Sequence, residues 1–362
     1  MPNNLVDPAV RAVIDRHRQF FAGGRHLLVK VALPSTEAAG TVRPPDFDTL
    51  DWSADFDDYV AANVRNCRQL AHWRLGLKIA DDTINCYHPY FGISIHHSFF
   101  GGAVHFGGGT SFADPVLDRA SLWPTLKADP DSPWLARLRR GLTYCRDQSD
   151  GAFFASFRGG NGPLDMANGV MGNAFFTELG DDPDNMRIVL DICSDAVRSV
   201  FQWQKQWCSH IDGGRIVPMG NIWVPDECIG HISLDAACLI GPRGFAQFEQ
   251  PWLEAILAEN GGAVIHTHML GRSGFHRMCQ TGNILVFAPV DDPNQPTVVD
   301  DLDFVLAQTE RVPLMFSLAA NRIVDTLPKL EGRQAVLLLT ATDADDAARQ
   351  LDAVDSLCTL DR

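Results

Sequence analysis

Short apolar runs alternate with longer amphipathic stretches along the whole chain, and this alternation constrains the fold more than any other feature of the sequence. An apolar run of about four to eight residues bounded by turn residues is typical of a buried strand, whereas apolar residues that recur every three or four positions are typical of a helix. Strands that alternate with helices form parallel sheets, because each helix carries the chain back across the sheet. The sequence therefore predicts an α/β fold.

Eight apolar runs fit strands, and eight is the strand number of a (β/α)8 TIM barrel. The chain has 362 residues, a length that such barrels reach as one domain. No boundary divides the chain, so we expect a single TIM-barrel domain over residues 1–362. The predicted strands cover His26–Leu33, Gly76–Asn85, Ala152–Phe157, Arg215–Trp223, Gly262–Met269, Ile284–Val290, Val312–Leu318 and Ala335–Thr340.

Helix signals lie between these runs. Asp182 can cap a helix that has Pro183 in its first turn, and apolar residues at helical spacing extend this helix to about Ser209. Another helix is expected to begin at Gly241 and to end at Asn260, with a kink at an internal proline. Two more amphipathic helices are predicted, over Pro8–Phe21 and Asp343–Ser356.

Residues 87–123 show neither the spacing of apolar residues typical of a strand nor that typical of a helix. Glycines and aromatic residues crowd together there, which indicates an elaborated loop after the second strand. A TIM barrel places the loops that follow its strands at the C-terminal mouth, where substrates bind. We therefore expect this loop to contribute to the mouth.

Composition excludes some classes of partner. The net charge is −15 and no basic stripe is present to neutralise phosphates, so nucleic acid is not expected as a partner. Nine scattered cysteines without a Cys-x-x-Cys pair are typical of a reducing compartment. The N-terminal segment is too charged for a signal peptide, and no apolar window of about 20 residues could span a membrane. The sequence indicates a cytoplasmic protein that does not bind membranes.

Three stretches, taken in order along the chain, resemble the uroporphyrinogen decarboxylase (URO-D) superfamily. They are Asp81–Gly92 with the following Phe99–Gly102, Gly162–Ala167 with the later Asp-Asp-Pro helix start, and Gly241–Phe245 with Val264–Gly271. The family shows D-D-x-I-P with P-Y-F-G and A-F-G, then G-P-L-D-x-A with D-D-P, then S-P-E-x-F with H-x-C-G. The resemblance implies a distorted TIM barrel with N-terminal helices, an active site at the C-terminal mouth and, as often in this group, a homodimer.

The superfamily contains haem-pathway decarboxylases and also zinc methyltransferases, which pass methyl groups between corrinoid proteins and thiols. The decarboxylases carry an arginine-rich motif close to the first strand, where it holds the carboxylates of the tetrapyrrole. The corresponding stretch here, Lys30–Glu37, has one lysine and no arginine. The resemblance is therefore closer to the methyltransferase-like branch, and it implies a small-molecule substrate and a corrinoid partner protein.

The strongest local signal is the pair His266 and His268. Residues two apart in a strand point to the same face, so both imidazoles should project together near the carboxyl end of the predicted fifth strand. Buried imidazoles need polar partners, and zinc is one ion that they bind. The other interpretation is that the pair holds a substrate carboxylate or belongs to a polar layer of the barrel. The resemblance favours zinc, because the two histidines fall on the family's H-x-C motif.

A third metal ligand is expected from Asp291 or its neighbour Asp292, which follow the sixth predicted strand and would enter the same mouth. The alternative is that these carboxylates belong to a solvated turn before Pro293. The family's zinc-binding cysteines are absent, both at His268 and after the last strand. An N/O ligand set accepts zinc but is less suited to activating a soft thiolate, so transfer to a coenzyme thiol is in doubt.

Three residues are candidates for catalysis. Asp82 matches the aspartate with which the decarboxylases hold pyrrole N–H groups, although a capping role fits it equally. Asp235 lies in a loop where family members often have an acidic residue. Tyr90 belongs to an aromatic and imidazole cluster of the long loop, which either lines a pocket or packs the loop; the other members are Tyr87, His88, His96 and His97. Cys228 is a further possible ligand or a packing residue.

These features lead to three hypotheses for function. The first is a metal-assisted methyltransferase or demethylase that uses zinc and acts with a corrinoid partner. The second is a metal-independent decarboxylase of a small or cyclic carboxylic acid, in which Asp82 stabilises the protonated intermediate. The third is a barrel that binds its ligand without catalysis.

Overall fold

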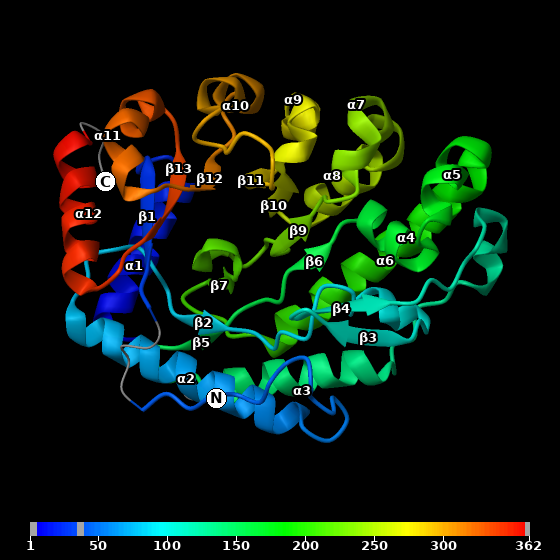
Figure 1. The fold of residues 1–362 in the computed structure, drawn as a ribbon, viewed down its shortest axis with the longest axis horizontal. Coiled ribbons are helices and arrows are strands. Elements are labelled where there is room, and N and C mark those ends of the chain that lie inside the picture. Colours follow the sequence, from blue (N-terminus) through cyan, green and yellow to red (C-terminus); the bar gives the residue numbers. More distant parts are fainter. Residues whose placement is uncertain (1–5, 35–39, 359–362) are drawn as a thin grey trace.

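The computed structural model describes residues 6–34 and 40–358, and its centre is a parallel sheet (Figure 1). Seven strands form this sheet in the order β1-β13-β12-β11-β10-β9-β6, and a separate parallel pair, β2-β5, lies beyond β6. The strands of both sheets are β1 (Leu27–Ala32), β2 (Cys86–Tyr87), β5 (Phe154–Ala155), β6 (Gly160–Asn161), β9 (His231–Ser233), β10 (Ala263–His268), β11 (Ile284–Val290), β12 (Leu314–Ser317) and β13 (Ala335–Thr340).

Helices cover the outer side of the arc that these strands form (Figure 1). They begin where capping signals place them: Asp182 accepts a hydrogen bond from the backbone of Asn185, and Asp343 accepts one from Asp346. The helices are α1 (Pro8–Phe21), α2 (Phe56–Leu77), α3 (Pro133–Asp147), α4 (Pro163–Met171), α5 (Ala174–Asp181), α6 (Pro183–Trp207), α7 (Ala237–Phe248), α8 (Gln250–Glu259), α9 (Phe275–Cys279), α10 (Leu302–Thr309), α11 (Ile323–Thr326) and α12 (Ala344–Leu357).

Alternate residues of each strand face different hydrophobic clusters. In β10, Ile265 packs outward with helix residues, whereas Val264 packs inward with residues of β1, β11, β12 and β13. Because side chains alternate along a strand, His266 and His268 share the inner face with Val264. The sheet therefore carries both imidazoles on its concave side.

The two sheets are not joined by strand pairing between β1 and β2 among the described residues. Instead, two aspartates that precede β2 form hydrogen bonds with the backbone of β1. The backbone N–H of Asp82 donates to the carbonyl of Val29 over 2.7 Å, and its carboxylate accepts the backbone N–H of the same residue over 2.7 Å. The carboxylate of Asp81 accepts the N–H of Val31 over 3.0 Å. Side-chain carboxylates thus satisfy donors of the β1 edge that a full strand would otherwise pair.

Six of the eight predicted strands correspond to strands of the structure, two of them, Ile284–Val290 and Ala335–Thr340, with the same bounds. Two predictions are wrong. The run Gly76–Asn85 is not a strand, because α2 continues to Leu77 and ends at Lys78 in a left-handed conformation. The run Arg215–Trp223 is an antiparallel hairpin, β7 (Gly214–Val217) with β8 (Ile222–Pro225). The fourth strand of the arc is instead β9, whose residues the sequence predicts to be part of a loop.

The predicted helices over Pro8–Phe21, from Asp182 to about Ser209, and over Asp343–Ser356 agree with α1, α6 and α12 to within two residues at either end. The helix expected from Gly241 to Asn260 is two helices. The first begins earlier, at Ala237, and Gly241 interrupts it with φ of 66°; the proline expected to cause a kink lies in the first turn of α8. The expected long loop contains a hairpin, β3 (Val104–Gly107) with β4 (Thr110–Ala113).

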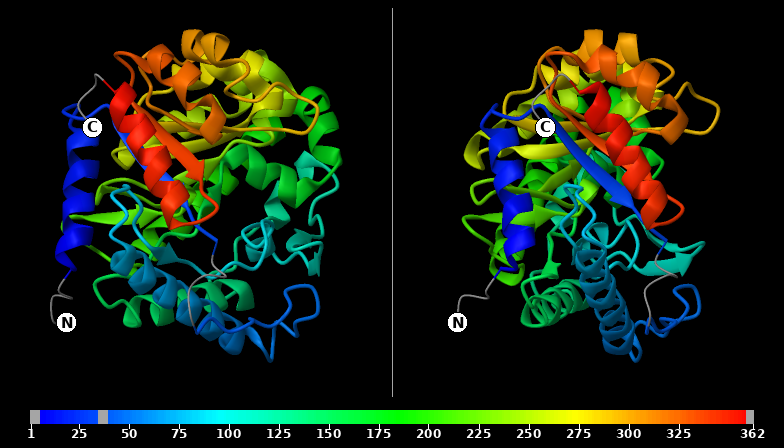
Figure 2. Two further views of the ribbon diagram at one scale, coloured as in Figure 1. Left: turned by 60° about the vertical axis from the view of Figure 1, so that its left-hand side comes forward. Right: turned by 90° about the vertical axis from the view of Figure 1, so that its left-hand side faces the viewer.

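Helix α1 and the β3–β4 hairpin lie on opposite sides of the sheet arc (Figure 2). Helix α1 packs against β1 and β8. No helix in the described ranges, 6–34 and 40–358, has the length and apolar character needed to cross a membrane.

Candidate metal centre

The carboxyl end of β10 carries two imidazoles side by side on its inner face. His266 and His268 have ring centroids 5.1 Å apart with their planes at 71°. Their side chains are 14% and 32% exposed, so they lie at the boundary between the core and solvent. The two rings lie close together, as the sequence predicts.

A carboxylate from the neighbouring strand completes this group. Strand β9 pairs with β10 so that Ser233 lies beside His266, and the chain then brings Asp235 over the two rings. Oδ1 of Asp235 lies 3.4 Å from Nε2 of His266 and 3.3 Å from Nε2 of His268. One donor atom from each of the three residues lies within 4.8 Å of the other two.

A second carboxylate orients one of the rings. Oδ1 of Asp292 lies 2.7 Å from Nδ1 of His268, and its Oδ2 accepts the backbone N–H of Leu270 over 2.7 Å. Asp291, the predicted third ligand, is not part of the group, since its carboxylate accepts the backbone N–H of Val298 over 2.7 Å. Asp291 therefore caps the turn, while Asp292 contacts His268.

The charges of the group hold the two imidazoles in different protonation states. Hydrogen bonds that His268 donates to Asp235 and to Asp292 raise its pKa to about 9 despite its partial burial. Burial lowers the pKa of His266, and Asp235 offsets this only in part. Burial alone would raise the pKa of Asp235, but hydrogen bonds from His268 and Ser233 lower it. In the metal-free protein at neutral pH, a proton therefore resides on His268 between two carboxylates.

Asp165, in the first turn of α4, fixes the loop that carries Asp235 by hydrogen bonds to its backbone. The two carboxylate oxygens of Asp165 accept the backbone N–H groups of Asp235, over 3.1 Å, and of Ala236, over 2.6 Å. Burial and the nearby charge of Asp235 raise the pKa of Asp165 to about 8. Glu249 lies behind it, fully buried, and accepts the N–H of Leu164 over 2.7 Å.

The donor set fits a zinc ion. Two donors of a tetrahedral zinc site with bonds of ~2.1 Å lie about 3.4 Å apart, and the carboxylate oxygen of Asp235 lies at this separation from both imidazole nitrogens. Because Nδ1 of His268 can donate its proton to Asp292, the lone pair of Nε2 is available for an ion. Three protein donors leave room for a further ligand, as in catalytic zinc sites.

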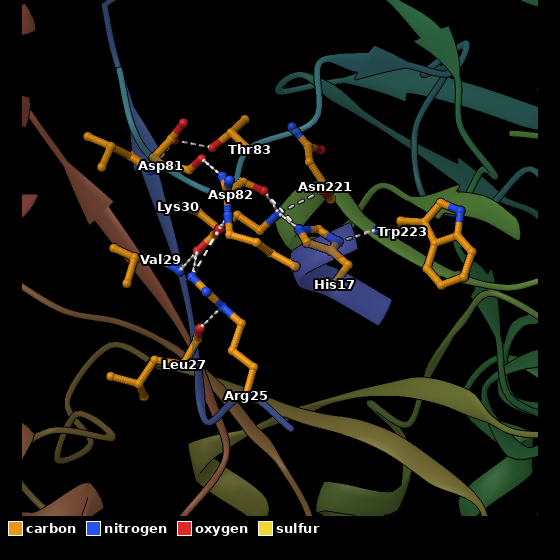
Figure 3. Close-up of polar contacts among 12 residues, drawn as sticks. His17, Arg25, Leu27, Val29, Lys30, Asp81, Asp82, Thr83, Asn221 and Trp223 are labelled. Atoms are coloured by element: carbon orange, nitrogen blue, oxygen red, sulfur yellow. Dashed lines mark hydrogen bonds and ion pairs between the residues drawn. The ribbon is translucent and has the colours of Figure 1, made fainter. Parts of the chain in front are cut away.

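Asp82 lies elsewhere, in a buried network of ion pairs and hydrogen bonds (Figure 3). It lies before β2 and not at the end of a strand over Gly76–Asn85, which corrects the position expected from the sequence. Its side chain is fully buried, with Oδ1 2.5 Å from Nε of Arg16 and 3.4 Å from Nη2 of Arg25. Burial alone would raise its pKa, but the two guanidinium groups lower it. These contacts give Asp82 a structural role, and its catalytic role stays a prediction.

The same network contains His17 and Lys30 (Figure 3). Nδ1 of His17 accepts the backbone N–H of Trp223 over 2.9 Å, so Nε2 carries the proton and donates to the carbonyl of Asp82 over 2.9 Å. Nζ of Lys30 donates to the carbonyls of Asp82 and, over 2.9 Å, of Asn221. Burial lowers the pKa of Lys30 to about 7. The network ties α1 and the β7–β8 hairpin to β1.

Tyr90 and the imidazoles of the long loop form a separate region. The ring of Tyr90 packs against Phe47, 5.7 Å between centroids, at the edge of an aromatic cluster. Nδ1 of His88 lies 3.3 Å from the hydroxyl of Ser156, and His96 lies between Asn161 and Arg158. No described contact links Tyr90 to the histidines of β10, so its catalytic role also stays a prediction.

No cysteine belongs to the candidate metal-binding group among the described residues. Sγ of Cys238 contacts the hydroxyl of Thr267 at 3.2 Å, on the opposite face of β10 from the two histidines. Cys228 is buried, and its thiol lies near the carbonyl of Gly261. The ligand set is therefore limited to nitrogen and oxygen.

Three residues around this group were not among the candidates predicted from the sequence. Asp165 stands inside the G-P-L-D motif, where its acidic side chain in a helix start was the available signal. His231 lies on β9 with its ring 6.0 Å from that of His266. Arg158 is an isolated cation in an apolar run, which is a signal for a buried charge.

Comparisons with known proteins found a similarity of fold and no match of sequence. No protein-family model matches the chain. No curated protein matches it either. Among solved structures it is similar to a methyltransferase from Methanosarcina mazei, with a TM-score of 0.60 and 13% sequence identity; the match covers 95% of this chain and 98% of that chain. At this identity the likeness shows a shared fold, over nearly the full length of both proteins.

Proposed function

We propose that this protein is a metal-assisted methyltransferase or demethylase whose zinc ion is bound by Asp235, His266 and His268. The observation that carries the proposal is the convergence of two imidazole nitrogens and one carboxylate oxygen within 4.8 Å. The full-length fold likeness to a methyltransferase supports the reaction class. A small-molecule methyl donor or acceptor and a corrinoid partner protein are the other participants that we propose.

The zinc ion would supply a Lewis acid that lowers the pKa of a bound acceptor and stabilises its anion. The protein supplies the orientation. Asp292 fixes the ring of His268 and its tautomer, and Asp165 fixes the loop that carries Asp235. Asp235, with its side chain half-exposed, is the member of the group most open to solvent, so we expect an acceptor to approach from its side.

The absence of sulfur from this group bears on the acceptor. Thiolate ligands make a zinc site soft, whereas imidazole and carboxylate make it harder. A site of two imidazoles and a carboxylate favours an oxygen or nitrogen nucleophile over the coenzyme thiol that the H-x-C motif serves.

We further propose that residues 1–362 form one domain and that the two sheets are parts of a single (β/α)8 barrel interrupted between β1 and β2. The backbone hydrogen bond from Asp82 to Val29 and the carboxylate contacts to the β1 edge support this interpretation. In such a barrel the carboxyl end of β10 opens into the substrate mouth.

Metal analysis of the purified protein tests the proposal. We expect near-stoichiometric zinc in the wild type and its loss in His266→Ala and His268→Ala. His276→Ala is the matched control, because this histidine is half-exposed on α9 and outside the group, so zinc should be retained. Wild-type protein that takes up no zinc after incubation with a slight excess of the ion would contradict the proposal.

A further inference from the structure

A buried arginine without an acidic partner lies beside the proposed metal centre. Arg158 follows β5 and is 4% exposed. Its Nη2 donates to the carbonyl of Gly92, its Nη1 lies 3.1 Å from Nε2 of His96, and its guanidinium lies over the ring of Phe91 at 5.0 Å. No carboxylate within residues 6–34 and 40–358 forms an ion pair with it, and its Nε has no hydrogen-bond partner there.

This lack of a counter-ion distinguishes Arg158 from other arginines of the core. Arg74 pairs with Asp81 at 2.8 Å, and Arg25 pairs with Asp82 at 3.4 Å. A buried charge without a partner is costly, so buried cations normally have a carboxylate beside them. Burial lowers the pKa of Arg158 to about 10, which still leaves the guanidinium charged at neutral pH.

The groups around Arg158 are neutral imidazoles. Nδ1 of His96 can donate to Oδ1 of Asn161 over 3.1 Å, which leaves its Nε2 to accept from Arg158. Burial and the charge of Arg158 lower the pKa of His96 well below its usual value, and the same causes lower the pKa of His88 to about 3. Arg158 therefore brings a positive charge to this region, and none of the described carboxylates forms an ion pair with it.

This region is continuous with the metal centre through His231. Gly159, which directly follows Arg158, lies so close to the ring of His231 that a Cβ atom there would be 2.0 Å from its Nδ1. The glycine lets the imidazole lie against the strand backbone. The ring of His231 is 6.0 Å from that of His266, and its buried Nδ1 has no hydrogen-bond partner among the described residues.

From this arrangement we infer that Arg158 binds the carboxylate of an organic substrate, with His231 as a second contact between that carboxylate and the metal centre. A monoanionic carboxylate balances the single positive charge, whereas a phosphate dianion would leave a buried negative charge in excess. A carboxylate also forms stronger, charge-assisted hydrogen bonds with a guanidinium than the neutral ring of His96 does, so it can displace that ring. The assignment of this molecule as the substrate depends on the proposed function; the anion site itself does not.

The test uses full-length protein freed of metal with a chelator, so that its result is independent of zinc. Propionate is the probe, propionamide is its neutral isostere and inorganic phosphate is the alternative anion, all at constant ionic strength. We expect propionate to raise the melting temperature and to bind in a calorimetric titration, and propionamide and phosphate to do neither.

Three variants sharpen the result. Arg158→Met should weaken propionate binding by roughly ten- to a hundredfold while its melting temperature without propionate stays at or above that of the wild type, because an unpaired buried charge is removed. Arg158→Lys should keep part of the binding. Arg272→Met removes a partly exposed arginine that is paired with Asp301, and it should leave the response unchanged.

The inference is overturned if wild-type protein responds equally to propionate and propionamide, or if Arg158→Met binds propionate as the wild type does. A response to phosphate at least as strong as to propionate would overturn the assignment to a carboxylate. His268→Ala, expected to lose zinc, should keep the propionate response, so failure of the metal centre and failure of the anion site are distinguishable.

Discussion

Nδ1 of His268 lies 2.7 Å from Oδ1 of Asp292, while Nε2 of the same ring faces Asp235 at 3.3 Å. The imidazole therefore has one nitrogen committed to an orienting carboxylate and the other directed into the candidate metal centre. Carboxylates that hold a ligating histidine in this way fix its tautomer and raise its basicity.

The first prediction concerns this orienting contact. Asp292→Asn should lower the zinc affinity by about ten- to a hundredfold without unfolding the protein, because the amide no longer favours the required tautomer. Competition with a chromophoric chelator measures the affinity. Asp291→Asn is the matched control: its amide oxygen can still accept the backbone N–H of Val298, so zinc affinity should not change. Equal losses in both variants would contradict the assigned roles.

The second prediction is that zinc binding releases a proton. His268 of the metal-free protein has a pKa raised to about 9, so at pH 7.5 an ion must displace its proton. We expect release of about one proton per zinc, and an apparent affinity that rises up to about tenfold per pH unit until about pH 9. Calorimetry in buffers of different ionisation enthalpy measures the release. A proton count near zero at pH 7.5 would contradict either the raised pKa of His268 or its role as a ligand.

The same pKa has a consequence for the stability of the metal-free protein. Because the folded protein holds the proton of His268 more tightly than the unfolded chain, this group stabilises the fold fully below its unfolded pKa of about 6.5. The contribution is lost as the pH rises toward about 9. Urea denaturation across this range should show the loss in the wild type and not in His268→Ala. A pH dependence that is the same in both proteins would argue against the two carboxylate contacts.

The third prediction concerns the buried network around Asp82. Asp82→Asn should destabilise the protein by about 3–5 kcal/mol at neutral pH, because Arg25 and Arg16 lose their buried counter-charge. Asp57→Asn, which breaks an exposed pair with Arg140, should cost no more than about 1 kcal/mol. Chemical denaturation measures both.

Acid should remove the difference between wild type and Asp82→Asn. The pKa of Asp82 is lowered in the folded protein, so its contribution is present above its unfolded pKa of about 3.9 and is lost as the pH falls through the lower folded value. A difference that stays constant down to the lowest pH at which both proteins remain folded would show that the charge of Asp82 is not its source.

The fourth prediction concerns Asp165 as a positioning residue. Asp165→Ala should weaken zinc binding, because the backbone N–H groups of Asp235 and Ala236 lose their acceptors and the loop is no longer fixed. Asp165→Asn keeps one oxygen acceptor and should restore part of the affinity. If the alanine variant is folded and binds zinc as tightly as the wild type, the loop is held by other contacts.

Much of the fold and the core of the site follow from short-range patterns. The period of two residues in a strand was sufficient to place His266 and His268 on one face, and the capping signals at Asp182 and Asp343 located their helices. These features depend on neighbouring residues only, which is why the sequence predicts them.

The remainder depends on how distant strands align. Asp235 reaches the two histidines because β9 pairs with β10, and β9 is too short to be recognised from its own residues. Asp291 and Asp292 differ by one position in a turn, and only the turn geometry decides which of them meets His268. Asp82 was misplaced because the apolar run before it continues a helix that stops at a left-handed lysine, Lys78.

The most direct test of the metal centre is X-ray absorption at the zinc edge of protein reconstituted with one equivalent of zinc. We predict nitrogen and oxygen scatterers at about 2.0–2.2 Å with the outer-shell signature of two imidazoles, and no sulfur at about 2.3 Å. The imidazole signature should disappear in the double variant His266→Ala/His268→Ala. A sulfur shell, or a spectrum with the two-imidazole signature unchanged in that variant, would contradict the assignment of Asp235, His266 and His268 as the zinc ligands.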